Sequence, residues 1–182
     1  YDPYVGEFFF GGRTLIVEGD TEYSAFRHVA SKFPGEYRSI HIVRARGKAT
    51  IVAVLKILNQ FGSSFAVLHD SDLPKNRKGQ TNSAWTLNER ILAEYNKRPK
   101  KEECRLVASL KNFESAYLGA EARDDKPYNA VNELNSNLDA FARVKTLLDA
   151  LVDVTKPLPE GCTEWHNITE LEGALKAAKF LE

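Results

Sequence analysis

The first half of the chain alternates short runs of β-branched and other apolar residues with stretches whose apolar positions recur at three- and four-residue steps. This alternation is typical of β-α-β units and predicts a mostly parallel sheet flanked by helices. The expected strands are the four apolar runs at 13–17, 39–44, 65–69 and 104–110. The expected helices are the periodic segments at 20–33, 49–61 and 82–95.

Polar and helix-breaking residues predict where these elements begin and end. Asp20 or Thr21 can cap the first helix, because both side chains accept hydrogen bonds from backbone N–H groups. The stretch 70–81 is expected to be a loop, since it is polar and contains Pro74 and Gly79.

The second half of the sequence has a helical pattern. Apolar residues at three- and four-residue steps predict one long helix or two shorter ones over 127–152, which could form a lid or cap on the core. A loop is expected at 156–165, and Thr169 with Glu172 forms a capping box that would open a last helix. The predicted organisation is an α/β core over 1–114 and an appended helical segment with C-terminal elements over 115–182.

Composition limits the class of protein. The chain has 182 residues, 43% of them hydrophobic, which suffices for one sizeable core. Its 25 basic and 25 acidic residues cancel, so a polyanion must be held by local patches or bound cations. No stretch reaches the roughly 20 apolar residues of a membrane span, so no membrane partner is expected. With only two cysteines and no secretion signal, the sequence favours a cytoplasmic protein.

Acidic residues follow three of the predicted strands. Glu18 ends the first strand and Glu22 lies four residues further on, while Asp70 and Asp72 leave the third strand and Glu114 follows the fourth. The carboxyl ends of parallel strands lie at one edge of a sheet. If the first, third and fourth strands are neighbours, five carboxylates converge on one rim.

Such a cluster predicts a site for divalent cations. Carboxylates that lie close together repel one another, and a cation relieves the repulsion. Because the donors are hard oxygens without a neighbouring Cys or His pattern, Mg²⁺ or Mn²⁺ is expected rather than structural zinc. Two ions about 3.5–4 Å apart could activate water on one side of a phosphodiester and stabilise the leaving oxygen on the other.

Each acid also has a purely structural explanation. Glu22 can complement a helix N-terminus, Asp70 and Asp72 can form a turn, and Glu114 can be a solvated residue. A Mg²⁺-binding receiver-like signalling module is an alternative of another class. That module would have paired acids after the first strand and one acid after the third, whereas here the Asp-Ser-Asp pair follows the third.

Two stretches of the chain resemble a known family. Residues 15–22 (LIVEGDTE) and 70–72 (DSD) are similar to the two signatures of a TOPRIM domain, the catalytic fold shared by topoisomerases, primases and several nucleases. Within that group the chain most resembles the C-terminal nuclease domain of the overcoming lysogenization defect (OLD) family. The features that favour this branch are the approach 6–10 (GEFFF), the second acid Glu22 and the helical segment after 110–114 (LKNFE).

The resemblance implies a metal-dependent DNA endonuclease in which all five acids surround two Mg²⁺ or Mn²⁺ ions. Glu18 would serve as a ligand or as a general acid or base. Lys126 resembles a lysine that OLD nucleases place before a helix near the active site, and Lys156 is a competing match. A non-catalytic TOPRIM interaction domain is a further alternative, which the intact acids argue against.

The resemblance also implies a missing partner domain. OLD proteins carry an ABC-type ATPase ahead of the nuclease domain, and no G-x-x-x-x-G-K-[ST] motif occurs in this sequence. We therefore expect an isolated catalytic domain, with nucleotide hydrolysis and a possible homodimer supplied by the absent N-terminal part.

Basic residues beside the predicted metal rim are candidates for DNA contacts. One group follows the Asp-Ser-Asp pair and another flanks the end of the second strand. Their contacts would be to phosphates and would not read the base sequence. The candidates are Lys75, Arg77, Lys78, Arg44, Arg46 and Lys48.

Overall fold

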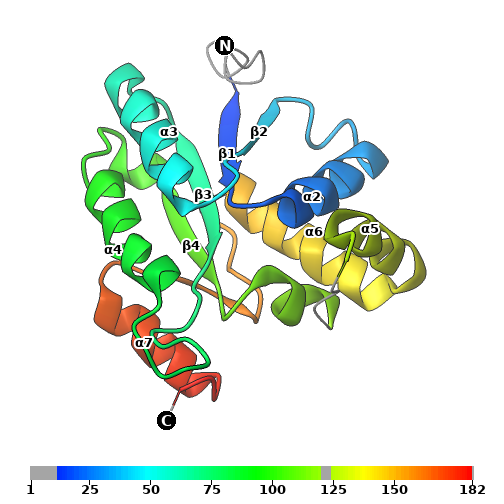
Figure 1. Cartoon of the computed structure of the whole chain (residues 1–182). Helices are drawn as coiled ribbons and strands as arrows, with labels where there is room; N and C mark the ends of the chain where they lie inside the picture. The colour runs from blue at the N-terminus through cyan, green and yellow to red at the C-terminus, as the bar shows by residue number, and fades with distance from the viewer. Residues whose placement is uncertain (1–11, 120–123, 182) are drawn as a thin grey trace.

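A computed structural model describes residues 12–119 and 124–181 of the chain. A five-stranded sheet with the order β2-β1-β3-β4-β5 forms its centre (Figure 1). The first four strands are parallel, and β5 runs antiparallel to β4. The strands are β1 (Arg13–Val17), β2 (Ile40–Arg44), β3 (Phe65–Asp70), β4 (Arg105–Ser109) and β5 (Cys162–Glu164).

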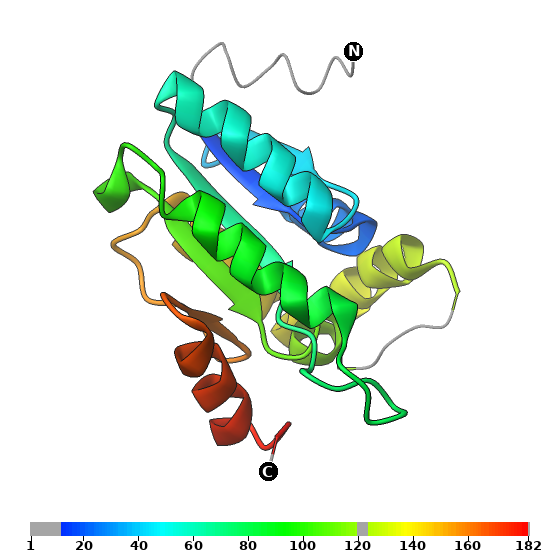
Figure 2. The same cartoon turned by 60° about the vertical axis from the view of Figure 1, so that its left-hand side comes forward.

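Helices cover both faces of the sheet. Figures 1 and 2 show α3 and α4 on one face and α2 and α6 on the other, with α5 beside α2. The helices are α2 (Asp20–Lys32), α3 (Lys48–Phe61), α4 (Ser83–Tyr95), α5 (Lys126–Ser136), α6 (Leu138–Val152) and α7 (Ile168–Ala177). Two short elements are the 3₁₀ turn η2 (Lys101–Glu103) and the π-helical turn η3 (Glu114–Leu118). The chain therefore has the three-layer α/β architecture that its alternating pattern predicts.

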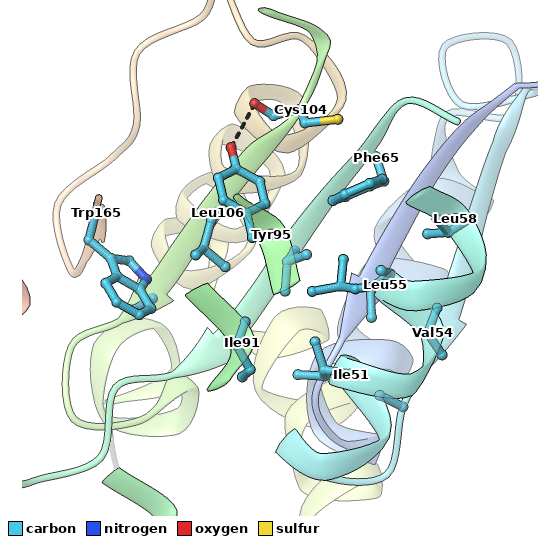
Figure 3. Close-up of a cluster of buried hydrophobic side chains, with 14 of the residues drawn as sticks. Ile51, Val54, Leu55, Leu58, Phe65, Ile91, Tyr95, Cys104, Leu106 and Trp165 are labelled. Carbon is cyan, nitrogen blue, oxygen red and sulfur yellow. Dashed lines mark hydrogen bonds between the residues drawn. The ribbon is translucent and has the colours of Figure 1, made fainter. Parts of the chain in front are cut away.

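The central strands are apolar on both sides because a helix layer covers each face of the sheet. In β1, Ile16 belongs to the cluster that contains α3 and α4, whereas Leu15 and Val17 belong to the cluster that contains α2 and α6. Figure 3 shows part of the first cluster, where the Tyr95 hydroxyl donates a hydrogen bond to the Cys104 carbonyl at 3.0 Å. These two packed faces hold the carboxyl ends of the strands in fixed register.

The chain beyond residue 114 contributes to the same core. Leu147, Leu148 and Leu151 of α6 are fully buried against the α2 side of the sheet, so α6 is a core element and not a lid. The expected loop at 156–165 instead contains β5, which pairs with β4. The pattern did not indicate this strand, since three residues are too short for a visible alternation.

Two helix starts differ from the expected ones. The N-cap of α2 is Gly19 without a side-chain cap, because Asp20 and Thr21 already lie inside the first turn. The last helix begins at Ile168, where Asn167 accepts from the N–H of Glu170, so Asn167 takes the place expected for Thr169. By contrast, Asn137 divides 127–152 into the two shorter helices that were one of the expected outcomes.

Candidate metal centre

The strand order brings the predicted acids to one edge of the sheet. β1 pairs with β2 on one side and with β3 on the other, so the direction in which successive strands are added to the sheet reverses between β1 and β3. Open α/β sheets bind ligands at such a switch point. Glu18 follows β1, and Asp70 ends β3. The Oε2 atom of Glu18 accepts a hydrogen bond from the backbone N–H of Asp70 at 3.1 Å. β4 lies on the other side of β3 and delivers the segment that leads to Glu114.

A cavity of about 590 Å³ opens at this edge. The five acids expected on one rim all line it, together with Asp20, Asp125 and Lys126. Its walls come from the starts of α2, η3 and α5 and from the ends of β1 and β3. The cavity is therefore strongly acidic, and among the described residues that line it Lys126 is the one lysine.

Glu22 folds back over the start of α2. The backbone N–H groups of Gly19 and of Glu22 itself favour the charged form of its carboxylate. A Cβ atom on residue 19 would lie 3.0 Å from Glu22 Oε2, so glycine leaves room for this carboxylate. Burial, together with repulsion from Glu18 and Glu114, raises the pKa of Glu22 to about 7.

Asp70 and Glu18 are perturbed in the same direction. Burial and the neighbouring Glu22 and Glu18 carboxylates raise the pKa of Asp70 well above its usual value, although Asp70 Oδ1 accepts the Phe113 N–H at 2.8 Å. Burial also raises the pKa of Glu18, and the nearby Lys48 ammonium opposes that rise. At both carboxyls, burial outweighs the stabilisation that neighbouring groups give the charged form.

The turn after β3 fixes the direction of Asp72. Ser71 is buried, donates its N–H to the Ser109 carbonyl at 2.8 Å and accepts the Lys111 N–H on Oγ at 2.8 Å. Asp72 has a positive φ of 57° and donates its N–H to the Lys111 carbonyl at 3.0 Å. Ser71 therefore ties the turns after β3 and β4 together.

Glu114 contacts two further elements. Its Oε1 atom accepts the hydroxyl of Thr21 at 3.2 Å and lies 3.2 Å from the Lys126 ammonium. Lys126 begins α5, and its side chain is 45% exposed at the cavity. Lys156 lies elsewhere, with its ammonium 3.8 Å from Asp149, and it does not line the cavity. Thr21 was expected only as a helix cap, so its contact with Glu114 had no signal in the sequence.

The cations expected to contact DNA occupy different environments. Lys75, Arg77 and Lys78 are exposed on the loop after β3, and Arg46 is exposed after β2. Arg44 is paired with Asp20 at 2.5 Å. Lys48 departs from the expectation, because its side chain is only 1% exposed. It lies at the start of α3, and its ammonium group contacts the carboxylate of Asp72. It therefore does not face solvent or an approaching phosphate.

His69 supports the site from within the sheet. It is fully buried, and burial lowers its pKa to about 3, so the ring is neutral. Nδ1 donates to the Asp70 carbonyl at 2.8 Å, and Nε2 accepts the indole N–H of Trp165 at 3.3 Å. The ring thus anchors the backbone of Asp70 and carries no charge into the cavity.

The donor set fits a hard divalent cation. Every acidic group that lines the cavity offers oxygen, and burial together with neighbouring carboxylates raises the pKa values of Glu18, Glu22 and Asp70. A cation bound there would favour the charged form of these groups. In the described ranges, however, no three acidic, histidine or cysteine side chains lie in position to hold one ion. Asp72 and Glu114 contact the ammonium groups of Lys48 and Lys126 instead. A bound cation would have to draw the carboxylates together.

Comparison with known families agrees with this geometry. Residues 9–72 match the family model of the overcoming lysogenization defect protein-like TOPRIM domain. The match at these residues supports a TOPRIM domain of the OLD type. The matched region contains Glu18, Glu22, Asp70 and Asp72, whereas Glu114 and Lys126 lie beyond it. The 6–10 segment that also favoured this family falls outside the described residues.

The match to the OLD-type TOPRIM model suggests a metal-binding, nuclease-type domain, because TOPRIM domains generally bind divalent metals. No curated protein matches the chain. Among the helices of the described residues, none has the length and apolar character needed to cross a membrane.

Proposed function

We propose that this OLD-type TOPRIM domain is a divalent-cation-dependent DNA endonuclease that hydrolyses phosphodiester bonds. The observation that carries the proposal is the meeting of five carboxylates, delivered by the ends of three neighbouring strands, in one cavity with Lys126 at its lining. The match to the OLD-type TOPRIM family supports it.

The five acids would hold two Mg²⁺ or Mn²⁺ ions. When bound, such ions supply Lewis acidity that activates water and stabilises the leaving oxygen. The residues that would hold them are Glu18, Glu22, Asp70, Asp72 and Glu114.

The chain's own groups would supply the remaining chemistry. Lys126 places an ammonium group on the exposed side of the cavity, where it would stabilise the negative charge that develops on the phosphate. Glu18 would serve as a metal ligand or as a general acid or base, and burial raises the pKa of its carboxyl above the usual value. The π-helical turn η3 and α5 position Glu114 and Lys126 against each other, which fixes the lysine at the cavity.

DNA would approach across the exposed basic loop after β3. Lys75, Arg77 and Lys78 project from the segment that follows Asp72, so phosphates bound there would lead toward the cavity. Arg46 offers a further exposed cation on the β2 side. We also propose that the domain acts while joined to an ABC-type ATPase, as the OLD family resemblance implies, and that this part provides homodimer formation.

A plasmid assay tests the proposed function. The purified chain is expected to nick or linearise supercoiled DNA with Mn²⁺ or Mg²⁺ and to lose this activity with EDTA. Asp70→Asn should abolish cleavage, because it removes a charge from the centre of the cluster without changing its size. Asp139→Asn is the matched control, since Asp139 is exposed on α6. Undiminished cleavage by the Asp70→Asn protein would rule out the assigned site.

A further inference from the structure

Lys48 is a buried cation in an unusual position. It begins α3, and the first turn of that helix contains no acidic residue. A positive charge at a helix N-terminus is unfavourable, because the backbone N–H groups there already carry partial positive charge. A lysine side chain that is only 1% exposed must therefore be stabilised by groups outside its own helix.

Three acceptors surround the Lys48 ammonium. Asp72 Oδ2 lies at 2.5 Å, Asn88 Oδ1 at 2.7 Å and the Ala84 carbonyl at 3.2 Å. An ammonium group has three protons, so these contacts use its whole donor capacity. Lys48 consequently has no proton left for a DNA phosphate, and its function must lie in what it holds.

The Lys48 network is joined to the turns that form the cavity. Asn88 donates from Nδ2 to the Ser71 carbonyl at 2.8 Å, so the same amide binds both Lys48 and the Asp-Ser-Asp turn. The residue before Lys48 is joined to the end of β1, because the Gly47 N–H donates to the Glu18 carbonyl at 2.9 Å. Gly47 has a φ of 117°, a conformation that favours glycine and lets the chain turn into α3 at this point.

Lys48 contacts only one of the two Asp72 carboxylate oxygens in this network. It holds Oδ2, while Asp72 lines the cavity and its side chain remains 30% exposed. Ligating carboxylates in metal sites are commonly held by hydrogen bonds from neighbouring groups, and loss of such a partner typically lowers metal affinity about 10–100-fold. The geometry of Asp72 matches that arrangement.

We propose that Lys48 is a positioning residue that holds Asp72 Oδ2 so that the carboxylate is presented to a divalent cation in the cavity, an inference that rests on the proposed function. Simple charge repulsion predicts the opposite effect, because an ammonium group close to the site would weaken cation binding. The two explanations therefore differ in the sign of the change when Lys48 is neutralised.

Calorimetric titration of the metal-free chain with Mn²⁺ alone tests the proposal without using activity. Lys48→Met keeps the length of the side chain and removes its charge and donors. We expect it to weaken Mn²⁺ binding about 10–100-fold. In an Asp72→Asn background, Lys48→Met should cause no further loss, because the group that Lys48 positions has already been changed.

Lys48→Gln provides a second variant that retains an amide donor for Asn88, and thermal unfolding in EDTA identifies the variants that fold. Folded Lys48 variants that bind Mn²⁺ as tightly as the unchanged chain, or more tightly, would overturn the positioning role and leave the proposed function intact. Further weakening by Lys48→Met in the Asp72→Asn background would also overturn it. Failure of the unchanged chain to bind Mn²⁺ would overturn both proposals.

Discussion

Neutralising Glu22 should stabilise the metal-free domain at alkaline pH. Glu22 is 4% exposed, and its carboxylate lies among Glu18 and Glu114, which repel it. Glu22→Gln removes the buried charge and preserves the size of the side chain. Its amide oxygen can still accept a hydrogen bond from a backbone N–H group at the start of α2.

The size and sign of the effect follow from the pKa of Glu22. The pKa rises from 4.5 to about 7, and each unit corresponds to about 1.4 kcal/mol, so the stabilisation reaches about 3 kcal/mol. Because the folded state holds the proton more tightly than the unfolded chain, the Glu22 carboxyl lowers stability as pH rises from about 4.5 to about 7. Above that range both states are ionised and the difference is constant.

Urea denaturation in EDTA between pH 5 and pH 8 measures the prediction. The unfolding free energies of Glu22→Gln and the unchanged chain should lie close together at the acidic end and separate as pH rises. Glu89→Gln, on the exposed side of α4, is the matched control and should show no such separation. Parallel stability curves for Glu22→Gln and the unchanged chain would refute the assignment of repulsive charge to Glu22.

Two further predictions concern Lys126 and Arg105. Lys126→Ala should reduce Mn²⁺-dependent plasmid cleavage about 100-fold, because it removes the ammonium group beside the cavity. The control variant, Lys156→Ala, should cleave at the rate of the unchanged chain. Equal cleavage rates for the two variants would argue against a role for Lys126. Arg105 is buried and donates to the carbonyl of Ala150 in α6, to two carbonyls in the segment after α6, and to Glu164 of β5. Arg105→Leu should therefore lower the unfolding free energy in urea by about 3–5 kcal/mol, and a loss below about 1 kcal/mol would contradict this role.

Much of the fold follows from local sequence. The strands at 13–17 and 65–69 are apolar on both faces, and α2, α3 and α4 show clear helical periodicity. The α/β class and most element bounds follow from these patterns. The short elements β5 and η3 were not predicted, because their three and five residues are too few to show a periodic pattern. Helix starts were misplaced where several capping residues lay next to one another, as at Asp20 and Thr21.

The sequence by itself determined that Glu18, Asp70 and Asp72 stand at strand ends, since that requires only the end of each apolar run. Tertiary structure decided that β1, β3 and β4 are neighbours, and strand order depends on long-range packing that local periodicity does not encode. It also decided that Lys48 is buried against Asp72 and not displayed to solvent. A lysine has the same appearance in a sequence whether water or a carboxylate surrounds its ammonium group, because only the folded chain brings residues 48 and 72 together.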